Sequence, residues 1–171
     1  MQSCSTERPL REAAAFAGLE ESLLERSPFD LSGGQKRRAA IAGVMAMRPR
    51  VLVLDEPTAG LDPQGREKML DRIMEYRDKT GSSVVLVSHS MEDVARCADR
   101  VLVLDHGRTV MCAETAEIFS DPEKLERIGL RVPQITSVFL RLAEMGYPVR
   151  SGIYTVERGV EEALRLLKGG N

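Results

Sequence analysis

The run Leu31-Ser32-Gly33-Gly34-Gln35 has the residue types of an anion-binding loop. Two adjacent glycines let the backbone approach a ligand closely, and a helix that begins at this point presents backbone N–H groups and a partial positive charge. The serine hydroxyl adds a further donor. The structural alternative is a loop that only caps the helix. The acidic residues further along the chain favour contact with the terminal phosphate of a nucleotide.

Two carboxylates, Asp55 and Glu56, directly follow the apolar run Val51–Leu54. At the end of a strand in an open α/β sheet they lie at the carboxyl edge, where such folds bind ligands. Asp55 is the candidate to hold Mg²⁺ through water. Glu56 is the candidate general base that polarises an attacking water during in-line hydrolysis. A solvated pair of acids at a strand end is the alternative, and the upstream loop makes it less favoured.

Asp62 and His89 complete the candidate residues. Aspartate before Pro63 is the pattern of a helix N-cap, and a second role of Asp62 across a subunit interface is a further hypothesis. His89 follows the apolar run Val84–Val87, so its imidazole is expected to reach a γ-phosphate or the carboxylate partner of the attacking water. His106 also follows a strand, and spacing alone barely separates the two histidines. The uninterrupted apolar run Val84–Val87 favours His89 as the candidate catalytic histidine, and His106 is interpreted as a turn residue.

Alternating strands and helices are expected to position these residues. Short apolar runs predict strands at Val51–Leu54, Val84–Val87 and Val101–Leu104, with a turn at Asp105-His106-Gly107 into a further strand at 109–112. Helical spacing and capping residues predict helices over Glu12–Leu24, from Ser32 to before Pro49, from Asp62 to Thr80, and from Ser90 through Cys97. This order indicates the α/β class, with residues 51–54 buried on both faces of a mostly parallel sheet flanked by helices.

After residue 114, prolines and glycines divide the chain into shorter pieces. We predict helices over Ala116–Phe119, Pro122–Ile128, Gln134–Met145 and Glu157–Lys168. The predicted organisation is an α/β domain over residues 1–113 and a small helical extension over residues 114–171. The extension carries no catalytic constellation.

Composition narrows the class of protein. The formal net charge of −2 over 171 residues argues against general nucleic-acid binding, which needs a basic surface. The longest basic run, Lys36-Arg37-Arg38, is expected to be a solvated helix face, with a phosphate or lipid contact as the alternative. Three cysteines without metal-ligand spacing favour a reducing cytosolic setting. Neither a run of about 18 apolar residues nor a leader sequence is visible, so any membrane role is expected to be peripheral.

The motifs together resemble those of ATP-binding-cassette ATPases. The run 31–35 is similar to the signature motif, 51–56 to the Walker B motif, 59–62 to the D-loop, and His89 to the H-loop histidine. The stretches 27–66 and 88–94 resemble the ATPases of energy-coupling factor transporters, which power uptake of vitamins and of cobalt or nickel ions. The resemblance spans nearly the whole chain and is weaker in the tail at 130–146.

The resemblance implies a partial P-loop NTPase core in this chain. It also implies a head-to-tail pair of ATPase subunits, a homodimer or a heterodimer, around two ATP molecules with Mg²⁺. It implies a role for each candidate: Glu56 and His89 as catalytic residues, Asp55 as metal ligand, and Leu31, Ser32, Gly33, Gly34, Gln35 and Asp62 as nucleotide-binding residues. Residues 31–35 then serve the partner's nucleotide, whereas the catalytic pair serves a nucleotide bound in cis. The pair acts on a transmembrane coupling protein and a substrate-binding membrane component, at the cytoplasmic face of the cell membrane.

No stretch of the chain reads Gly-x-x-x-x-Gly-Lys-Ser/Thr, the loop that cradles nucleotide phosphates in P-loop enzymes. We therefore expect the C-terminal portion of a longer ATPase, inactive by itself. One alternative is a module that donates only its signature loop to a full-length partner. Another is a non-transport cassette ATPase of the DNA-repair or translation type, although the coiled-coil insertions or basic surfaces usual in those proteins do not occur here.

Overall fold

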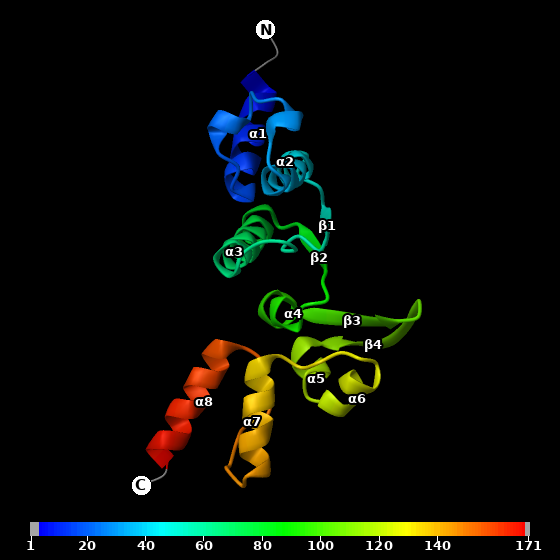
Figure 1. Ribbon diagram of the computed structural model, residues 1–171, viewed down its shortest axis with the longest axis vertical. Helices are drawn as coiled ribbons and strands as arrows, with labels where there is room; N and C mark the ends of the chain where they lie inside the picture. The colour runs from blue at the N-terminus through cyan, green and yellow to red at the C-terminus, as the bar shows by residue number, and fades with distance from the viewer. Residues whose placement is uncertain (1–3, 170–171) are drawn as a thin grey trace. The chain divides into compact units, whose positions relative to one another are not determined.

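The computed structural model describes residues 4–169 and forms two compact units, divided between Ser88 and His89. Figure 1 shows the order of the elements. The first unit contains α1 (Cys4–Ala17), the short 3-10 helices η1 (Glu21–Leu23) and η2 (Pro28–Asp30), α2 (Gly33–Ala46), β1 (Val51–Asp55), α3 (Pro63–Thr80) and β2 (Ser83–Val87). The second unit contains α4 (Met91–Cys97), β3 (Arg100–Asp105), β4 (Arg108–Glu114), α5 (Thr115–Ile118), α6 (Pro122–Arg127), α7 (Gln134–Glu144) and α8 (Val156–Gly169).

The sheet of the first unit is the parallel pair β1 and β2. Its register runs from Val51 opposite Ser83 to Asp55 opposite Val87. The connection passes through α3, which provides the long crossover that a parallel pair requires. The predicted parallel pairing is therefore confirmed, and the carboxyl ends of both strands lie at one edge of the sheet.

One face of this sheet packs on helices. Leu52 and Leu54 are buried with Met45 of α2 and Ile73 of α3 in one apolar cluster. Burying side chains of this size contributes about 1.5–3 kcal/mol each. The hydroxyl of buried Tyr76 donates to the Met45 carbonyl at 3.1 Å, so the polar tip of the ring is satisfied inside the core.

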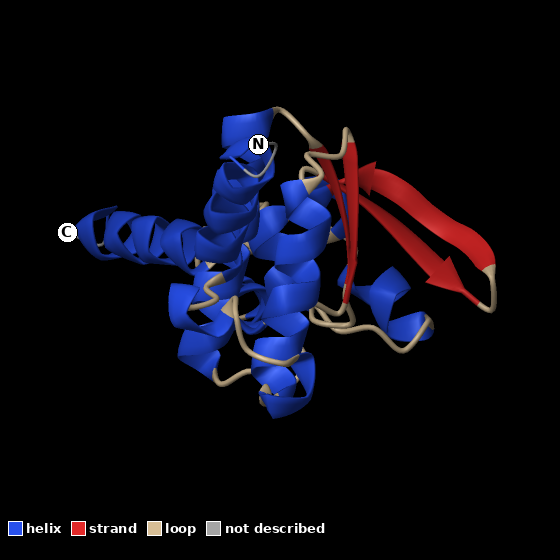
Figure 2. Ribbon diagram, turned by 90° about the horizontal axis from the view of Figure 1, so that it is seen from above, coloured by secondary structure: helices blue, strands red, loops and turns tan. Residues whose placement is uncertain are grey.

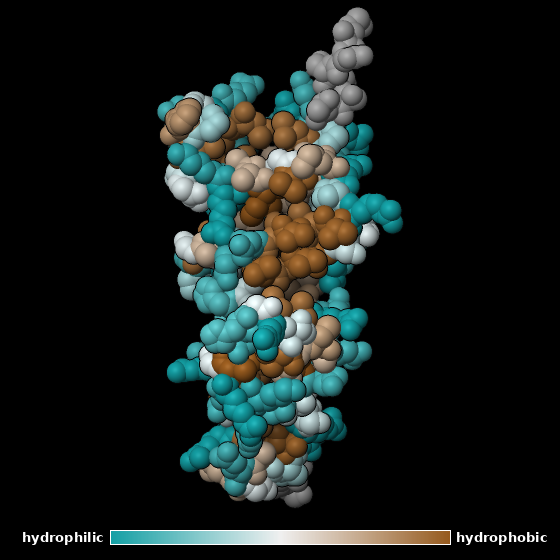
Figure 3. Space-filling view, turned by 90° about the vertical axis from the view of Figure 1, so that its right-hand side faces the viewer, coloured by the Kyte–Doolittle hydropathy of each residue, from teal (hydrophilic) through white to brown (hydrophobic). Residues whose placement is uncertain are grey.

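The expectation that residues 51–54 are buried on both faces is wrong. Val51 and Val53 are 55% and 62% exposed, and Val85 and Val87 of β2 are also exposed. Side chains of a strand alternate between faces, and within the described residues α2 and α3 cover the face of Leu52 and Leu54. Figure 3 shows hydrophobic side chains gathered over β1 and β2. The four valines therefore form an exposed apolar sheet face.

The first helix lies earlier than its residue pattern indicates. The helix α1 ends at Ala17 because Gly18 adopts φ +70° and the Leu19 N–H donates to the Ala14 carbonyl at 2.8 Å, a glycine-based helix end. In the rest of the range predicted as helix, up to Leu24, the structure has the 3-10 turn η1 in place of an α-helix. Leu19 and Leu23 are buried in the same cluster as residues of α1, so apolar residues continue past the end of the helix. The sequence pattern therefore does not mark where α1 ends.

The second unit is built around the antiparallel hairpin of β3 and β4, drawn as two red arrows joined by a tight loop in Figure 2. His106 and Gly107 have φ values of +46° and +73°, the signs required by a two-residue type I′ turn. The predicted turn is confirmed. The C-terminal helices α5 to α8 lie within one residue of their predicted ranges at each end.

The division between the two compact units falls after Ser88 and does not coincide with the predicted boundary after residue 113. That domain boundary stays a prediction. None of the helices that the structure describes is both long and apolar enough to cross a bilayer.

A buried ion pair organises the end of the chain. Glu162 of α8 is only 4% exposed, and its carboxylate accepts from Arg165 Nε at 2.8 Å and from the Arg150 N–H at 2.7 Å. Arg165 also donates to the Pro148 carbonyl. The Arg165 hydrogen bonds lower the pKa of Glu162 from 4.5 to about 2, against the opposing effect of burial. The segment 148–150 is thereby tied to α8.

We expect Glu162→Gln to lower the melting temperature at neutral pH, because the carboxylate that ties residues 148–150 is lost. A lowered pKa contributes stability that is complete above the unfolded value of 4.5 and disappears as pH falls toward 2. The difference between variant and wild type should therefore shrink over that interval in thermal melts. Glu161→Gln, at the exposed neighbouring position, is the control. A difference that stays constant with pH would contradict this assignment.

Candidate functional site

The helix α2 begins with a complete capping box. Ser32 is the N-cap, and its Oγ accepts from the Gln35 N–H at 3.3 Å. In return, the Ser32 N–H donates to Gln35 Oε1 at 2.8 Å. Sequence reasoning recognised the helix start but not this pair, although the spacing Ser-x-x-Gln is the signal for it. The box fixes the backbone of residues 32–35 without any ligand.

The glycines of this loop leave room for an anion. A Cβ atom added at Gly33 would meet no heavy atom within 4 Å, so the space beside the helix N-terminus is open. No acidic residue lies in the first turn of α2. The Ser32 hydroxyl accepts a bond within the cap and keeps its proton for donation. Leu31 is 8% exposed and anchors the loop in the core. The predicted anion-binding loop, residues 31–35, thus has an accessible set of donors.

Asp55 and Glu56 lie at the carboxyl end of β1. Asp55 is exposed, and the Glu56 N–H donates to the Val87 carbonyl at 2.9 Å, which extends the β1–β2 ladder by one bond. Glu56 is half-buried and adopts φ +47°. This left-handed region is unfavourable for a residue with a side chain, by roughly 1–2 kcal/mol. Such strain at a strand end is a feature of functional sites.

Residues 56–61 form a compact turn after Glu56. The Ala59 N–H donates to the Glu56 carbonyl at 3.1 Å, and the Leu61 N–H donates to the Thr58 carbonyl at 3.2 Å. Asp62 then caps α3, since its Oδ1 accepts from the Gly65 N–H at 2.9 Å. A Cβ at position 65 would lie 2.5 Å from that oxygen, so a side chain there would displace the Asp62 cap. The N-cap prediction for Asp62 is confirmed.

The basic run at 36–38 is not only a solvated face. Arg37 Nη1 donates to the Ala59 carbonyl at 3.0 Å, and Nη2 donates to the Asp55 carbonyl at 3.3 Å. Arg37 is a residue that sequence reasoning missed, because its acceptors lie 18 and 22 positions away and carry no signal of their own. It joins the helix of the anion-binding loop to the turn that contains Glu56.

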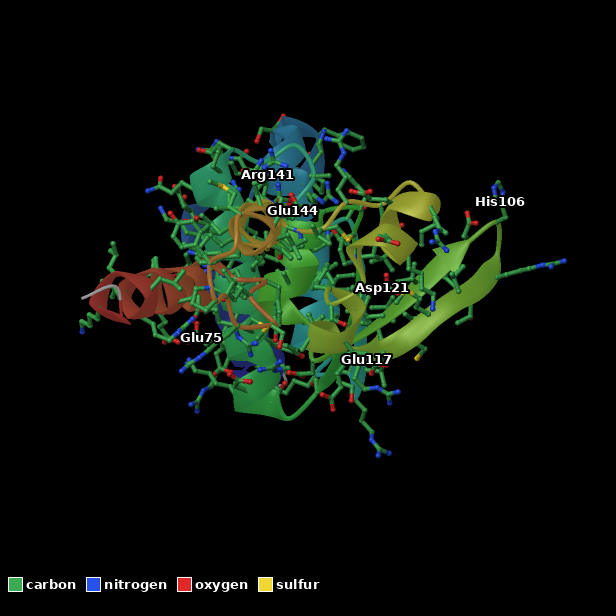
Figure 4. All side chains as sticks on the ribbon, turned by 90° about the horizontal axis from the view of Figure 1, so that it is seen from below. Glu75, His106, Glu117, Asp121, Arg141 and Glu144 are labelled. Carbon is green, nitrogen blue, oxygen red and sulfur yellow. The ribbon has the colours of Figure 1, made fainter. Side chains whose placement is uncertain are left out.

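The two histidines lie in the second unit. His89 is exposed and precedes Ser90, whose side chain caps α4 by accepting from the Asp93 N–H at 3.2 Å. The catalytic role of His89 stays a prediction. His106 occupies the tip of the β3–β4 hairpin, as Figure 4 shows, with its side chain 95% exposed.

Asp55 is the candidate metal ligand of this site. Among the residues that the structure describes, no group of three or more His, Cys, Asp or Glu side chains is arranged to hold a metal ion. Asp55 offers one exposed carboxylate beside a turn, a hard oxygen ligand of the kind that Mg²⁺ takes together with nucleotide phosphates and water.

A cleft of about 1070 Å³ lies at the opposite end of the sheet, where the strands begin. It is lined by residues such as Arg48, Arg50, Tyr76 and Ser83. None of the candidate residues lines it, so it is separate from the candidate site.

The chain is similar in sequence to known proteins. The sequence model of the ABC transporter family matches residues 5–59. The energy-coupling factor transporter ATP-binding protein EcfA2 of Caldanaerobacter subterraneus subsp. tengcongensis is 49% identical over 158 residues, 92% of this chain and 55% of the relative. EcfA2 of Symbiobacterium thermophilum is 47% identical over 167 residues, 98% of this chain and 58% of the relative. The chain spans little more than half the length of these relatives.

Solved structures show a similar fold. The ATP-binding cassette MJ0796, in a dimeric post-hydrolysis state bound to ADP and Pi, is 29% identical with a TM-score of 0.61, covering 67% of this chain and 49% of that one. The structure of cbiO1 from Clostridium perfringens, part of the ABC transporter complex cbiONQ, is 35% identical with a TM-score of 0.59. That match covers 77% of this chain and 52% of cbiO1.

We expect Ser32→Ala to lower the free energy of unfolding by about 1 kcal/mol, because it removes the N-cap of α2. Ser32→Gly should lower it by only about a few tenths of a kcal/mol. Denaturant titrations of both variants measure this, with Lys36→Ala on the exposed side of the same helix as control. Wild-type stability in Ser32→Ala would show that the capping box contributes nothing.

Proposed function

The chain belongs to the ATP-binding-cassette ATPases of the energy-coupling factor type, and from that premise we propose that it is part of the ATP-binding subunit of an importer. Such a subunit couples ATP binding and hydrolysis to uptake of a vitamin or a transition-metal ion. The fold class expected from sequence, α/β with a partial P-loop NTPase core of the ATP-binding-cassette type, is confirmed by the solved cassettes. The observation that carries the proposal is the pair of Arg37 hydrogen bonds that joins α2, the helix that begins at the predicted anion-binding loop, to the turn of Asp55 and Glu56.

In this proposal residues 31–35 bind the terminal phosphate of a nucleotide held by a partner subunit. The Ser32 hydroxyl and the first backbone N–H groups of α2 donate to the phosphate oxygens. Gln35 orients Ser32 through the capping box. The capped helix holds these donors in place before the ligand arrives, so little reorganisation accompanies binding.

Asp55, Glu56 and His89 serve the nucleotide bound in cis. The exposed Asp55 carboxylate is the residue that would hold Mg²⁺, which neutralises phosphate charge when bound. Glu56 orients and polarises the attacking water as general base. A catalytic role of His89 toward the γ-phosphate is proposed from its resemblance to the H-loop histidine. Water activation requires Glu56 to keep a fixed position, which the bonds of the turn at 56–61 provide.

The proposed partners are a second cassette ATPase subunit, a transmembrane coupling protein and a substrate-binding membrane component. The dimeric state of MJ0796 and the membership of cbiO1 in a transporter complex support this assembly. The proposed location is peripheral, at the cytoplasmic face of the cell membrane.

We further propose that these 171 residues neither bind ATP tightly nor turn it over by themselves, since their sequence contains no Gly-x-x-x-x-Gly-Lys-Ser/Thr loop. The test is a titration with a fluorescent ATP analogue and Mg²⁺, using this chain and a version extended upstream by its natural sequence. Binding by the extended version alone supports the proposal. Tight binding by the 171 residues would overturn it and require a different phosphate site.

The second candidate function is a module that donates only residues 31–35 to a full-length cassette partner. The complete capping box at α2 favours it, because the loop is formed within this chain. Mixing the chain with a full-length cassette subunit then stimulates ATP turnover. Ser32→Ala abolishes that stimulation and Glu56→Gln leaves it unchanged, whereas the first candidate requires both residues.

We expect Glu56→Gln in the upstream-extended protein to lower ATP turnover by about 100-fold or more, since general-base catalysis contributes about 10²–10⁴-fold. Nucleotide-driven dimerisation should persist because the amide keeps the size of the side chain. Steady-state phosphate release and light scattering measure the two properties. Glu67→Gln, at an exposed position of α3, is the matched control. Unchanged turnover in Glu56→Gln would remove Glu56 from the mechanism.

Asp62 allows its cap to be separated from its proposed interface role. Asp62→Asn keeps an N-cap oxygen, so stability should change by less than about 0.5 kcal/mol, whereas Asp62→Ala should lose about 1 kcal/mol. If Asp62 also acts across the interface, Asp62→Asn lowers dimerisation and turnover without destabilising the fold. Denaturant titration and phosphate release measure both. Wild-type dimerisation and turnover in Asp62→Asn would show that Asp62 acts as a helix cap without the proposed interface role.

A further inference from the structure

The guanidinium of Arg37 bridges two backbone carbonyls on either side of Glu56. Nη1 lies 3.0 Å from the Ala59 oxygen and Nη2 lies 3.3 Å from the Asp55 oxygen. Arginine presents its N–H donors in a rigid planar fork, and hydrogen bonds from a charged donor are stronger than neutral ones. Arg37 therefore fixes two points of the chain relative to each other and to α2.

The residue between these two points is held in an unfavourable conformation. Glu56 has φ +47°, and such a conformation persists only where surrounding contacts determine it. The Val87 carbonyl holds the Glu56 N–H, and buried Pro57 and Thr58 follow. The Arg37 bonds add the connection to a helix.

Arg37 also lies close to the anion-binding loop along the chain. It follows Gln35 by two residues in the same helix, whose first turn is fixed by the Ser32 and Gln35 capping box. A helix of this length is rigid over one turn, so a displacement of residues 31–35 moves the Arg37 side chain with it.

We propose that Arg37 is a positioning residue that couples the anion-binding loop to Glu56. Resting on the proposed function, in which the loop serves the partner's nucleotide and Glu56 the nucleotide in cis, Arg37 links the two ATP sites of the dimer. When the loop closes on one phosphate, the carbonyls of Asp55 and Ala59 move with α2, and the Glu56 turn moves with them. No proton or covalent step is assigned to Arg37.

Hydrogen exchange tests the positioning directly. In Arg37→Met, the amides of Glu56, Ala59 and Leu61 should exchange about tenfold faster or more, as expected on loss of hydrogen bonds from a charged donor. Arg37→Lys should give an intermediate effect, because an ammonium is a point charge rather than a fork. Lys36→Met removes the neighbouring exposed charge and should leave these amides unchanged.

Amides in the core of α3, at Leu70 and Ile73, separate positioning from general stability. They should keep their wild-type protection in Arg37→Met. Equal acceleration throughout the first unit, or no acceleration at residues 56–61, overturns the proposal. The measurement is made on the 171-residue chain and on the upstream-extended protein, so it does not depend on ATP hydrolysis.

ATP saturation curves of the upstream-extended protein test the link between sites. Arg37→Met should lower kcat more than it changes KM and should reduce the Hill coefficient toward 1, while Arg37→Lys restores part of both. If exchange accelerates locally but kcat and the Hill coefficient stay at wild-type values, Arg37 does not couple the sites. If the wild-type protein itself hydrolyses no ATP, the proposed function fails, while the exchange result alone decides whether Arg37 positions Glu56.

Discussion

The parallel pairing of β1 with β2 is the constraint on which the rest of the first unit depends. Its register places Asp55 opposite Val87, and the Glu56 N–H continues the ladder to the Val87 carbonyl. A shift of one residue would turn Leu52 and Leu54 from the core to solvent, so packing on α2 and α3 fixes the register. Because that register also sets where the strand ends, the same burial that stabilises the core determines where the two carboxylates emerge.

The starts of α2, α3 and α4 share one local chemistry, yet among these three the start of α2 is the one suited to an anion. Ser32, Asp62 and Ser90 each accept a backbone N–H from the residue three positions on. Asp62 already places a negative charge at the N-terminus of α3, and Glu92 and Asp93 do so in the first turn of α4. The first turn of α2 has a neutral cap, two glycines and no acid. Its partial positive charge is therefore left for a ligand. Capping and phosphate binding are compatible in Ser32 because a hydroxyl both accepts and donates.

Local signals explain what could be predicted from sequence. Residues adjacent in the chain determine the cap at Asp62, the turn at 105–107 and the C-terminal helices, and these predictions are confirmed. The exposed faces of Val51 and Val53, and the two carbonyls that Arg37 contacts, depend on which segments meet in space. An apolar run indicates that a strand is suited to burial, but the elements that pack on each face determine whether its side chains are buried. Likewise, a basic run indicates only charge, whereas the hydrogen bonds of Arg37 depend on the distant carbonyls of Asp55 and Ala59.

A positive φ alone does not identify a functional residue, and a comparison within this chain shows what does. Arg48, Glu56 and His106 share almost the same φ, near +46°. His106 obtains it from a hairpin turn that requires the sign, and its side chain points into solvent. Arg48 follows the end of α2 and pairs with Glu12 at 2.9 Å. Glu56 alone among the three is half-buried, directly follows a strand of the core and lies between two carbonyls that one arginine holds. Glycine would adopt this conformation without strain, so a carboxylate at position 56 is best explained by the chemistry of its side chain.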